Sequence, residues 1–208
     1  MRKKRQNDPE GVQRNILEVA TAEFAQRGFS GARVDAIADR TRTSKRMIYY
    51  YFGSKERLYL AVLEAAYRAI RQQESTLELE HQTPAQALAI LVASTFDYYE
   101  AHPEFVRLVM NENILGGAHM KRSKAIGKLN VTVIDAVQRI LARGEKEGAF
   151  RRGIDPIELH MTISALGIFN VANRATFSTI FKRDMSSPKA LSTRRNEIVE
   201  MILQHVRP

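Results

Sequence analysis

Apolar residues recur along most of this chain at the three- and four-residue spacing of an amphipathic helix. The first such segment predicts a helix over residues 9–27, with Asp8 as its N-cap and Pro9 in its first turn. Its apolar face is formed by Val12, Ile16, Val19, Ala20 and Phe24. Gly28 is expected to end the helix.

Two short helices and one long helix follow in the pattern. The short ones are predicted at about 33–40 and 44–51, separated by the break TRTS at 41–44. Ser54 then favours the start of a long helix over about 55–80.

The rest of the chain is more apolar and also reads as helix. Further helices are predicted over 84–101, from 103 to the glycine pair 116–117, and over 119–147, 156–181 and 187–206. No stretch shows the alternation of a strand. The pattern therefore predicts an all-α protein of about nine helices.

The two short helices have the dimensions of a helix-turn-helix unit, in which the second helix enters the major groove of DNA. Ile37, Ile48 and Phe52 are suited to its small core. Lys45, Arg46 and Tyr49 then lie away from that core, as side chains that read base edges must.

The stretch RGFSGARVDAIADRTRTSKRMIYYYFGSKERL resembles the DNA-binding domain of TetR-family (TetR/AcrR) transcriptional regulators. The matching features are Gly28-Phe29, the apolar helix from Val34 to Ala38, Tyr49 to Phe52, and Ser54-Lys55-Glu56. The resemblance implies a three-helix DNA-binding domain at 1–57 and a larger helical bundle for effector binding and dimerisation at 58–208.

The resemblance also implies which side chains contact DNA. Lys45 and Arg46 are expected at base edges, since both side chains favour the acceptors of guanine. Lys55 is expected to share a phosphate with the start of its helix. The full predicted set is Arg33, Thr43, Ser44, Lys45, Arg46, Tyr49, Tyr50 and Lys55. The alternative is that these are ordinary surface charges and packing tyrosines.

Two positions depart from the family pattern. Ala32 stands where a capping Thr is common, and losing an N-cap oxygen costs about 1 kcal/mol. Arg42 occupies the turn position usually held by Gly, so it must either adopt a positive φ or change the turn. The neighbouring Arg33 is the residue that could supply a contact in place of the missing Thr.

Positive charge is concentrated near the start of the chain. The formal net charge is +9, and residues 1–57 carry +6 of it. Arg2, Lys3, Lys4 and Arg5 precede any acid and form a basic arm at 1–7. Such an arm is either a solvated tail or a segment that neutralises phosphates.

For the bundle at 58–208, the resemblance implies a small-molecule pocket. The predicted effector-binding residues are Tyr67, Tyr99, Phe105, Met110, Asn113, Phe169, Asn170, Asn173, Arg174 and Phe177. If Arg174 contacts the effector, the effector would carry a carboxylate or a similar acceptor. Core packing is the alternative for each of these side chains.

The last two helices are expected, again by resemblance, to form a homodimer interface. Ile198, Met201, Ile202 and His205 share a face of the last helix, although such a stripe could equally pack inside the monomer. A dimer would read a palindromic operator in double-stranded DNA.

Other function classes fit the sequence poorly. It contains no cysteine, and its five histidines show no metal-binding or catalytic spacing, so neither an enzyme, a metal nor a cofactor is expected. No apolar run is long enough for a membrane span, which favours a cytoplasmic location.

The leading interpretation is a repressor that a small-molecule effector releases from DNA. A transcriptional activator and a ligand-independent DNA-binding regulator are the alternatives, and a third is a protein whose basic arm binds acidic lipids.

Overall fold

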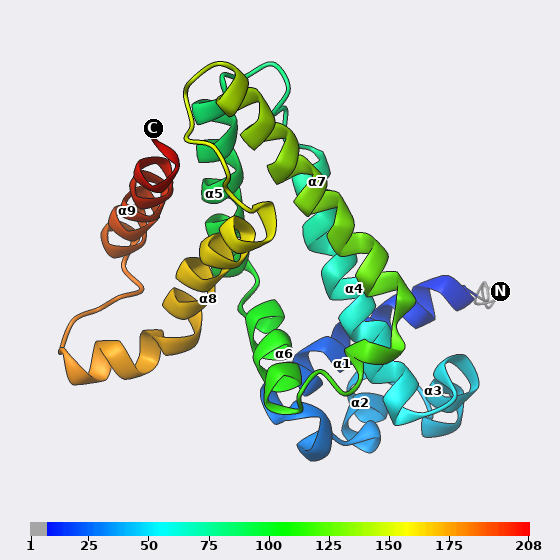
Figure 1. Cartoon of the computed structure of the whole chain (residues 1–208). Helices are drawn as coiled ribbons and strands as arrows, with labels where there is room; N and C mark the ends of the chain where they lie inside the picture. The colour runs from blue at the N-terminus through cyan, green and yellow to red at the C-terminus, as the bar shows by residue number, and fades with distance from the viewer. Residues whose placement is uncertain (1–7) are drawn as a thin grey trace, which may run out of the picture. The chain divides into compact units, whose positions relative to one another are not determined.

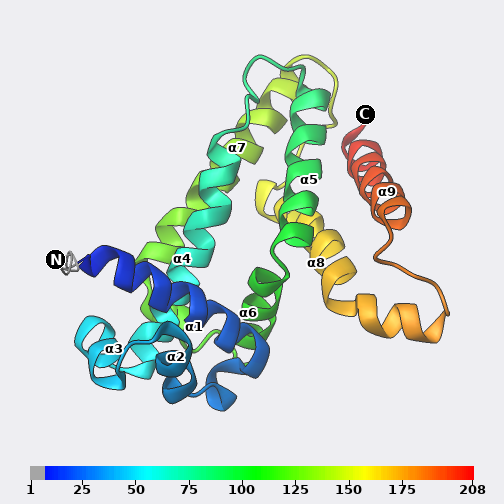
Figure 2. The ribbon, with the colours of Figure 1, turned by 180° about the vertical axis from the view of Figure 1, so that it is seen from behind.

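The computed structural model describes residues 8–208, and every regular element in that range is helical (Figures 1 and 2). The all-α prediction is therefore confirmed. The elements are α1 (Pro9–Gly31), α2 (Val34–Thr41), α3 (Lys45–Phe52), α4 (Lys55–Ser75), α5 (Pro84–Ala101), α6 (Pro103–Ile114), a single 3-10 turn (Met120–Arg122), α7 (Lys124–Lys146), α8 (Pro156–Ile180) and α9 (Pro188–Val206).

Several helices begin where side chains cap them. The Asp8 carboxylate accepts a hydrogen bond from the Gly11 amide at 2.9 Å, as the sequence predicts. Thr83 and Gln86 form a reciprocal capping box at the start of α5. Asp155 caps α8 and Ser187 caps α9, and a proline stands in the first turn of each of these helices.

Three predicted boundaries differ from the structure. The first helix continues to Gly31, but Gly28 has a φ of 66° and interrupts it with a kink. α4 ends at Ser75 rather than near 80, because Thr76 and Leu77 donate to carbonyls three residues back and tighten the last turn. α7 begins at Lys124 rather than 119, after the separate 3-10 turn.

The chain divides into two compact units. The first contains the described residues up to Ala66 together with Arg107–Ser123, and the second contains Tyr67–Val106 and Lys124–Pro208. In the first unit, α2 packs against both α1 and α3. The segment carrying most of α6 therefore belongs with the N-terminal helices, although the sequence separates them.

In the second unit, α5 is the central helix and contacts α7, α8 and α9 (Figure 2). The hydrophobic core includes Leu88, Val137 and Leu159, and it also contains Ile198 and Ile202 of α9. The expectation that Ile198 and Ile202 face a second subunit is therefore wrong, because both are 1% exposed within the protomer. Met201, from the same predicted stripe, is 42% exposed.

The helices of residues 8–208 include none with the length and apolar character needed to cross a membrane. The basic arm predicted at residues 1–7 lies outside the described range.

Candidate DNA-binding surface and interior cavity

The turn between α2 and α3 is held by buried apolar side chains and by local hydrogen bonds. Ile37 and Ile48 are completely buried. The Thr41 hydroxyl donates to the Ile37 carbonyl at 2.8 Å, and the Thr43 amide donates to the Ala38 carbonyl at 3.1 Å. These contacts fix the orientation of α3 relative to α2. Phe52, predicted in the same core, is partly exposed.

The two departures from the family pattern are both accommodated. Arg42 adopts the left-handed conformation, with φ 53° and ψ 33°, so the turn is kept at a backbone cost of about 1–2 kcal/mol. Arg33 is the N-cap residue of α2, and its side chain makes no capping hydrogen bond. Instead, the buried Glu23 carboxylate accepts a hydrogen bond from the Arg33 amide at 3.3 Å.

The solvent-facing side of α3 combines basic and aromatic side chains. Lys45 and Arg46 are exposed, Tyr49 is 37% exposed and Tyr50 is 75% exposed. The Ser44 hydroxyl accepts from the Met47 amide at 3.2 Å and so caps the helix. Cations and flat rings can contact phosphates and base edges from such a face.

Both lysines of the predicted set already have partners. Lys45 Nζ lies 3.0 Å from Asp35 Oδ1, in an exposed ion pair of the kind worth less than about 1 kcal/mol. Lys55 Nζ lies 5.0 Å from the centre of the Phe29 ring, and it donates to the Ser30 carbonyl at 3.5 Å. A nucleic-acid phosphate can replace either partner at little cost.

All eight predicted DNA-contact residues belong to the first unit. Arg33, Ser44, Lys45, Arg46, Tyr49 and Tyr50 are exposed, while Thr43 and Lys55 are partly exposed. Their individual roles remain predictions.

The first unit also contains a buried carboxylate, that of Glu112. Glu112 is 1% exposed and accepts from the amides of His119 at 2.6 Å and Met120 at 2.9 Å. The His119 ring contacts Glu112 at 3.1 Å through Nδ1 and packs on Phe29, with ring centres 4.4 Å apart. Burial raises the pKa of Tyr59, and the charge of Glu112 adds to this rise.

Comparison with known proteins agrees with this geometry. Residues 16–62 match the model of bacterial regulatory proteins of the tetR family, and residues 84–202 match the tetracyclin repressor-like C-terminal domain. The chain belongs to the TetR family of transcriptional regulators. It is therefore a DNA-binding regulator with the fold that its sequence predicts.

Three relatives show how far the similarity extends. The chain is 36% identical to the transcriptional repressor NicS of Pseudomonas putida over 193 residues, which is 93% of this chain and 91% of NicS. It is 32% identical to the regulator RutR of Escherichia coli over 157 residues, 72% of this chain and 69% of RutR. The crystal structure of the Streptomyces coelicolor regulator SCO4942 superimposes with a TM-score of 0.70 at 25% identity, covering 95% of this chain and 99% of that one.

The predicted effector-binding residues of the second unit have different surroundings. Tyr99 and Phe105 are buried, with their rings stacked 5.8 Å apart, and the Tyr67 ring lies 5.4 Å from Phe105. Asn170 and Arg174 both donate to the Glu100 carboxylate. Arg174 is thus already paired with an acid.

The other members of the predicted set lie closer to solvent. Phe169 is 48% exposed and Phe177 36% exposed, and Asn173 donates to the Phe169 carbonyl at 3.3 Å. Met110, 40% exposed, and Asn113 belong to the first unit. The ten residues remain predictions.

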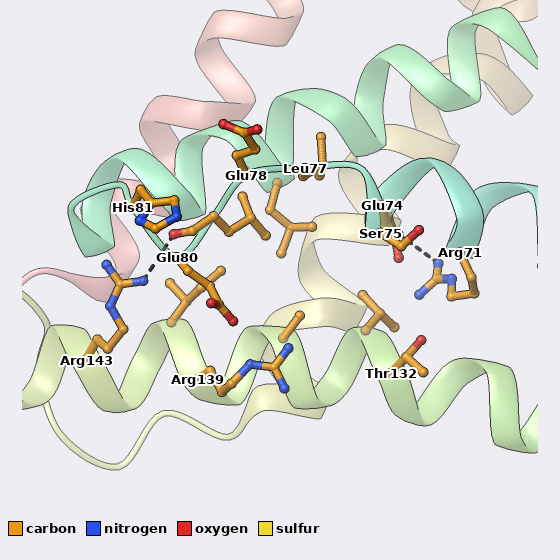
Figure 3. Close-up of a pocket in the computed structure, with 15 residues that line it drawn as sticks. Arg71, Glu74, Ser75, Leu77, Glu78, Glu80, His81, Thr132, Arg139 and Arg143 are labelled. Carbon is orange, nitrogen blue, oxygen red and sulfur yellow. Dashed lines mark hydrogen bonds and ion pairs between the residues drawn. The ribbon is translucent and has the colours of Figure 1, made fainter.

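A cavity of about 730 Å³ lies elsewhere in the second unit, between the end of α4, the following loop, α5 and α7 (Figure 3). Its lining contains none of the ten predicted residues. It is formed by Arg71, Glu74, Ser75, Leu77, Glu78, Leu79, Glu80, His81, Leu91, Thr132, Val133, Ala136, Arg139, Ile140 and Arg143. This site was not predicted, because Arg71 and Glu74 stand in a polar run, RQQES, that is typical of a solvated helix end.

Proposed function

We propose that this protein is a repressor that binds a palindromic operator as a homodimer and is released by a small-molecule effector. It would act in the cytoplasm, where the chromosome is accessible, and would carry out no catalysis. The observation that carries the proposal is the exposed basic and aromatic face of α3, held over the buried Ile48. The repressor NicS, similar over nearly the whole chain, supports the direction of regulation.

The DNA-binding part can be tested by selecting preferred sequences from random duplex DNA with the full-length protein at about physiological salt. We expect enrichment of an inverted repeat. Arg46→Ala should weaken binding to the selected repeat by about 1–3 kcal/mol, because a bidentate base contact is worth that much. Arg139→Ala, which removes an exposed arginine of the second unit, is the matched control and should leave binding unchanged.

Two results would contradict the assignment. Salt-sensitive binding without sequence enrichment would leave a helix-turn-helix fold that does not read sequence. An equal loss in Arg46→Ala and Arg139→Ala would move recognition away from α3. Transcription is then measured, with and without the protein, from a promoter that carries the selected repeat. A repressor lowers this transcription, and an activator raises it.

Support for the dimer comes from exposed apolar side chains on α8. Ile157 is 60% exposed and Met161 57%, and the two lie one turn apart on α8. Phe169, 48% exposed, packs against the ring of Phe177, and Phe177 packs against Phe181 just after the helix. Exposed apolar side chains grouped in this way are expected to be covered by another protein surface.

Sedimentation of single variants tests this interface. Met161→Glu should shift the chain from dimer to monomer, because a carboxylate would be buried without a partner. Val131→Glu makes the same change on α7 at a side chain that is 55% exposed, and the dimer should persist. A Met161→Glu dimer as stable as the wild type would exclude this face.

A further inference from the structure

Arg71 is a buried cation with incomplete pairing. Its side chain lies near the end of α4, and the residue is 8% exposed. Arg71 Nη2 lies 2.9 Å from Glu74 Oε1, which is one turn further along the helix (Figure 3). Arg71 Nε and Nη1 are buried and have no acceptor among residues 8–208. Burying a guanidinium group in this way costs folding free energy unless an anion or several acceptors bind its N–H groups.

Glu74 neutralises Arg71 only in part. Burial raises the pKa of Glu74 to about 7, and the positive charge of Arg71 only partly opposes this rise. Near neutral pH a large share of the Glu74 side chains is therefore protonated and uncharged, and Arg71 is then left without a counter-ion.

The other titratable side chains that the charge of Arg71 influences supply no second negative charge, and the two further acids of the cavity lining, Glu78 and Glu80, are exposed. Burial, together with the charge of Arg71, lowers the pKa of His160 to about 4, so this ring is neutral at pH 7. Burial raises the pKa of Tyr98 to about 12 and also raises that of Tyr99, so both hydroxyls stay protonated. The Tyr99 hydroxyl donates to Ser164 rather than contacting Arg71.

The cavity next to Arg71 combines this cation with an apolar wall. Leu91, Val133 and Ile140 line it and are at most 3% exposed. Arg143, a second lining cation, is already used: it donates to the Leu79 carbonyl at 3.1 Å and also to the Gln82 carbonyl. In Figure 3 the Arg71 guanidinium points from α4 towards the space between α4 and α7.

We propose that this cavity binds a small organic acid, with Arg71 holding the anionic group and Leu91, Val133 and Ile140 contacting the apolar body. That the acid is the effector rests on the proposed function, whereas the binding site itself does not. The carboxylate of Glu74 competes for the same guanidinium group, so the ligand binds best when Glu74 is protonated.

The probe pair for this site is 1-anilinonaphthalene-8-sulfonate and N-phenyl-1-naphthylamine. The two dyes share one apolar body, and only the first carries an anionic group. Fluorescence titration of the full-length protein without DNA measures both affinities. Arg71→Met removes the cation at similar size, while Arg68→Met makes the same change at an exposed arginine of α4 that does not line the cavity.

We expect Arg71→Met to weaken binding of the sulfonate dye about 10- to 100-fold, because hydrogen bonds to a charged group are lost. Binding of the neutral dye should change less than about threefold, because this dye loses no such bond. Retained binding of the neutral dye also shows that the variant is folded. Arg68→Met should leave both affinities near wild type. Equal sulfonate-dye affinity in Arg71→Met and wild type, or no saturable sulfonate-dye binding to the wild type, overturns the site.

A second experiment tests whether the anion site also regulates DNA binding. If the dye acts as an effector at this site, saturating sulfonate dye lowers operator affinity in the wild type and not in Arg71→Met, and operator DNA weakens dye binding by the same factor. Binding through Arg71 without any change in operator affinity upholds the anion site and shows that the dye is not an effector, because only a ligand with different affinities for the two conformations shifts their balance. Failure of operator binding itself, with the dye site intact, contradicts only the proposed function.

Discussion

The buried Glu112 carboxylate should be one of the strongest single contributions to the stability of the first unit. It is 1% exposed and accepts two backbone hydrogen bonds, from His119 at 2.6 Å and Met120 at 2.9 Å, besides its contact with the His119 ring. Replacing Glu112 with Ala removes the carboxylate that both amides donate to. Each unsatisfied buried donor costs about 1–3 kcal/mol, and because these two amides are half-buried we expect a total loss of about 2–4 kcal/mol.

Glu104 provides a matched control on the same helix. It makes a similar contact to a histidine, with His102 Nδ1 at 3.0 Å from Glu104 Oε1, but the two side chains are 38% and 45% exposed. Glu104→Ala should therefore cost less than about 1 kcal/mol. The two variants differ in the burial of the lost carboxylate and in the two backbone hydrogen bonds that Glu112 accepts, so the comparison measures the combined effect of burial and of those bonds.

Urea denaturation followed by circular dichroism measures both free energies of unfolding. Amide hydrogen exchange at His119 and Met120 reports whether the loss is local, because those amides should lose protection in Glu112→Ala and not in Glu104→Ala. Glu112→Gln, which keeps one acceptor oxygen, should fall between Glu112→Ala and the wild type. A loss below 1 kcal/mol in Glu112→Ala, or equal losses in Glu112→Ala and Glu104→Ala, would refute the reasoning.

Three further predictions concern the turn, a cap and the cavity. Arg42→Gly should raise the free energy of unfolding by about 0.5–1 kcal/mol in urea titrations, because Gly avoids the left-handed penalty but loses more chain entropy; a loss would mean that the Arg42 side chain stabilises the turn. Ser44→Ala should cost about 1 kcal/mol in the same assay, whereas Ser75→Ala, at the exposed end of α4, should cost little. Because the folded state raises the pKa of Glu74 from 4.5 to about 7, it holds a proton that the unfolded chain releases in this window, so stability falls as pH rises from about 5 to 7. Glu74→Gln should remove this part of the pH dependence of the urea midpoint, and an unchanged pH profile would contradict the assignment.

Local patterns in the sequence predicted most of the helices and the recognition unit. Capping residues such as Asp8 and Asp155 satisfy backbone donors within a few positions, so their effect is visible without the fold. The outward face of α3 was also predictable, because Ile48 fixes which side of so short a helix is buried. Helix ends without such markers, as at Ser75, were placed less well.

Three features were misjudged because they depend on segments distant in the sequence. Ile198 forms an apolar stripe that suits a dimer or a core equally well, and only the position of α5 decides between them. Arg174 looked free to bind an anion until the structure placed Glu100, from another helix, beside it. Arg71 looked solvated because its burial is caused by the loop and helices around it rather than by its neighbours in sequence.

The proposed regulation requires a link between the cavity and the recognition unit, and α4 is the one continuous element that contributes to both. Its first residue is Lys55, a predicted phosphate contact, and its last two turns carry Arg71 and Glu74. The segment KERLYLAVLEAAYRAIRQQES contains neither Pro nor Gly, so it lacks the residues at which helices most often kink. An acid that binds Arg71 can release DNA only if it binds more tightly to the conformation of α4 in which Lys55 is misplaced. Substituting Gly within α4 should therefore weaken the coupling between the two ligands more than it weakens the binding of either ligand alone.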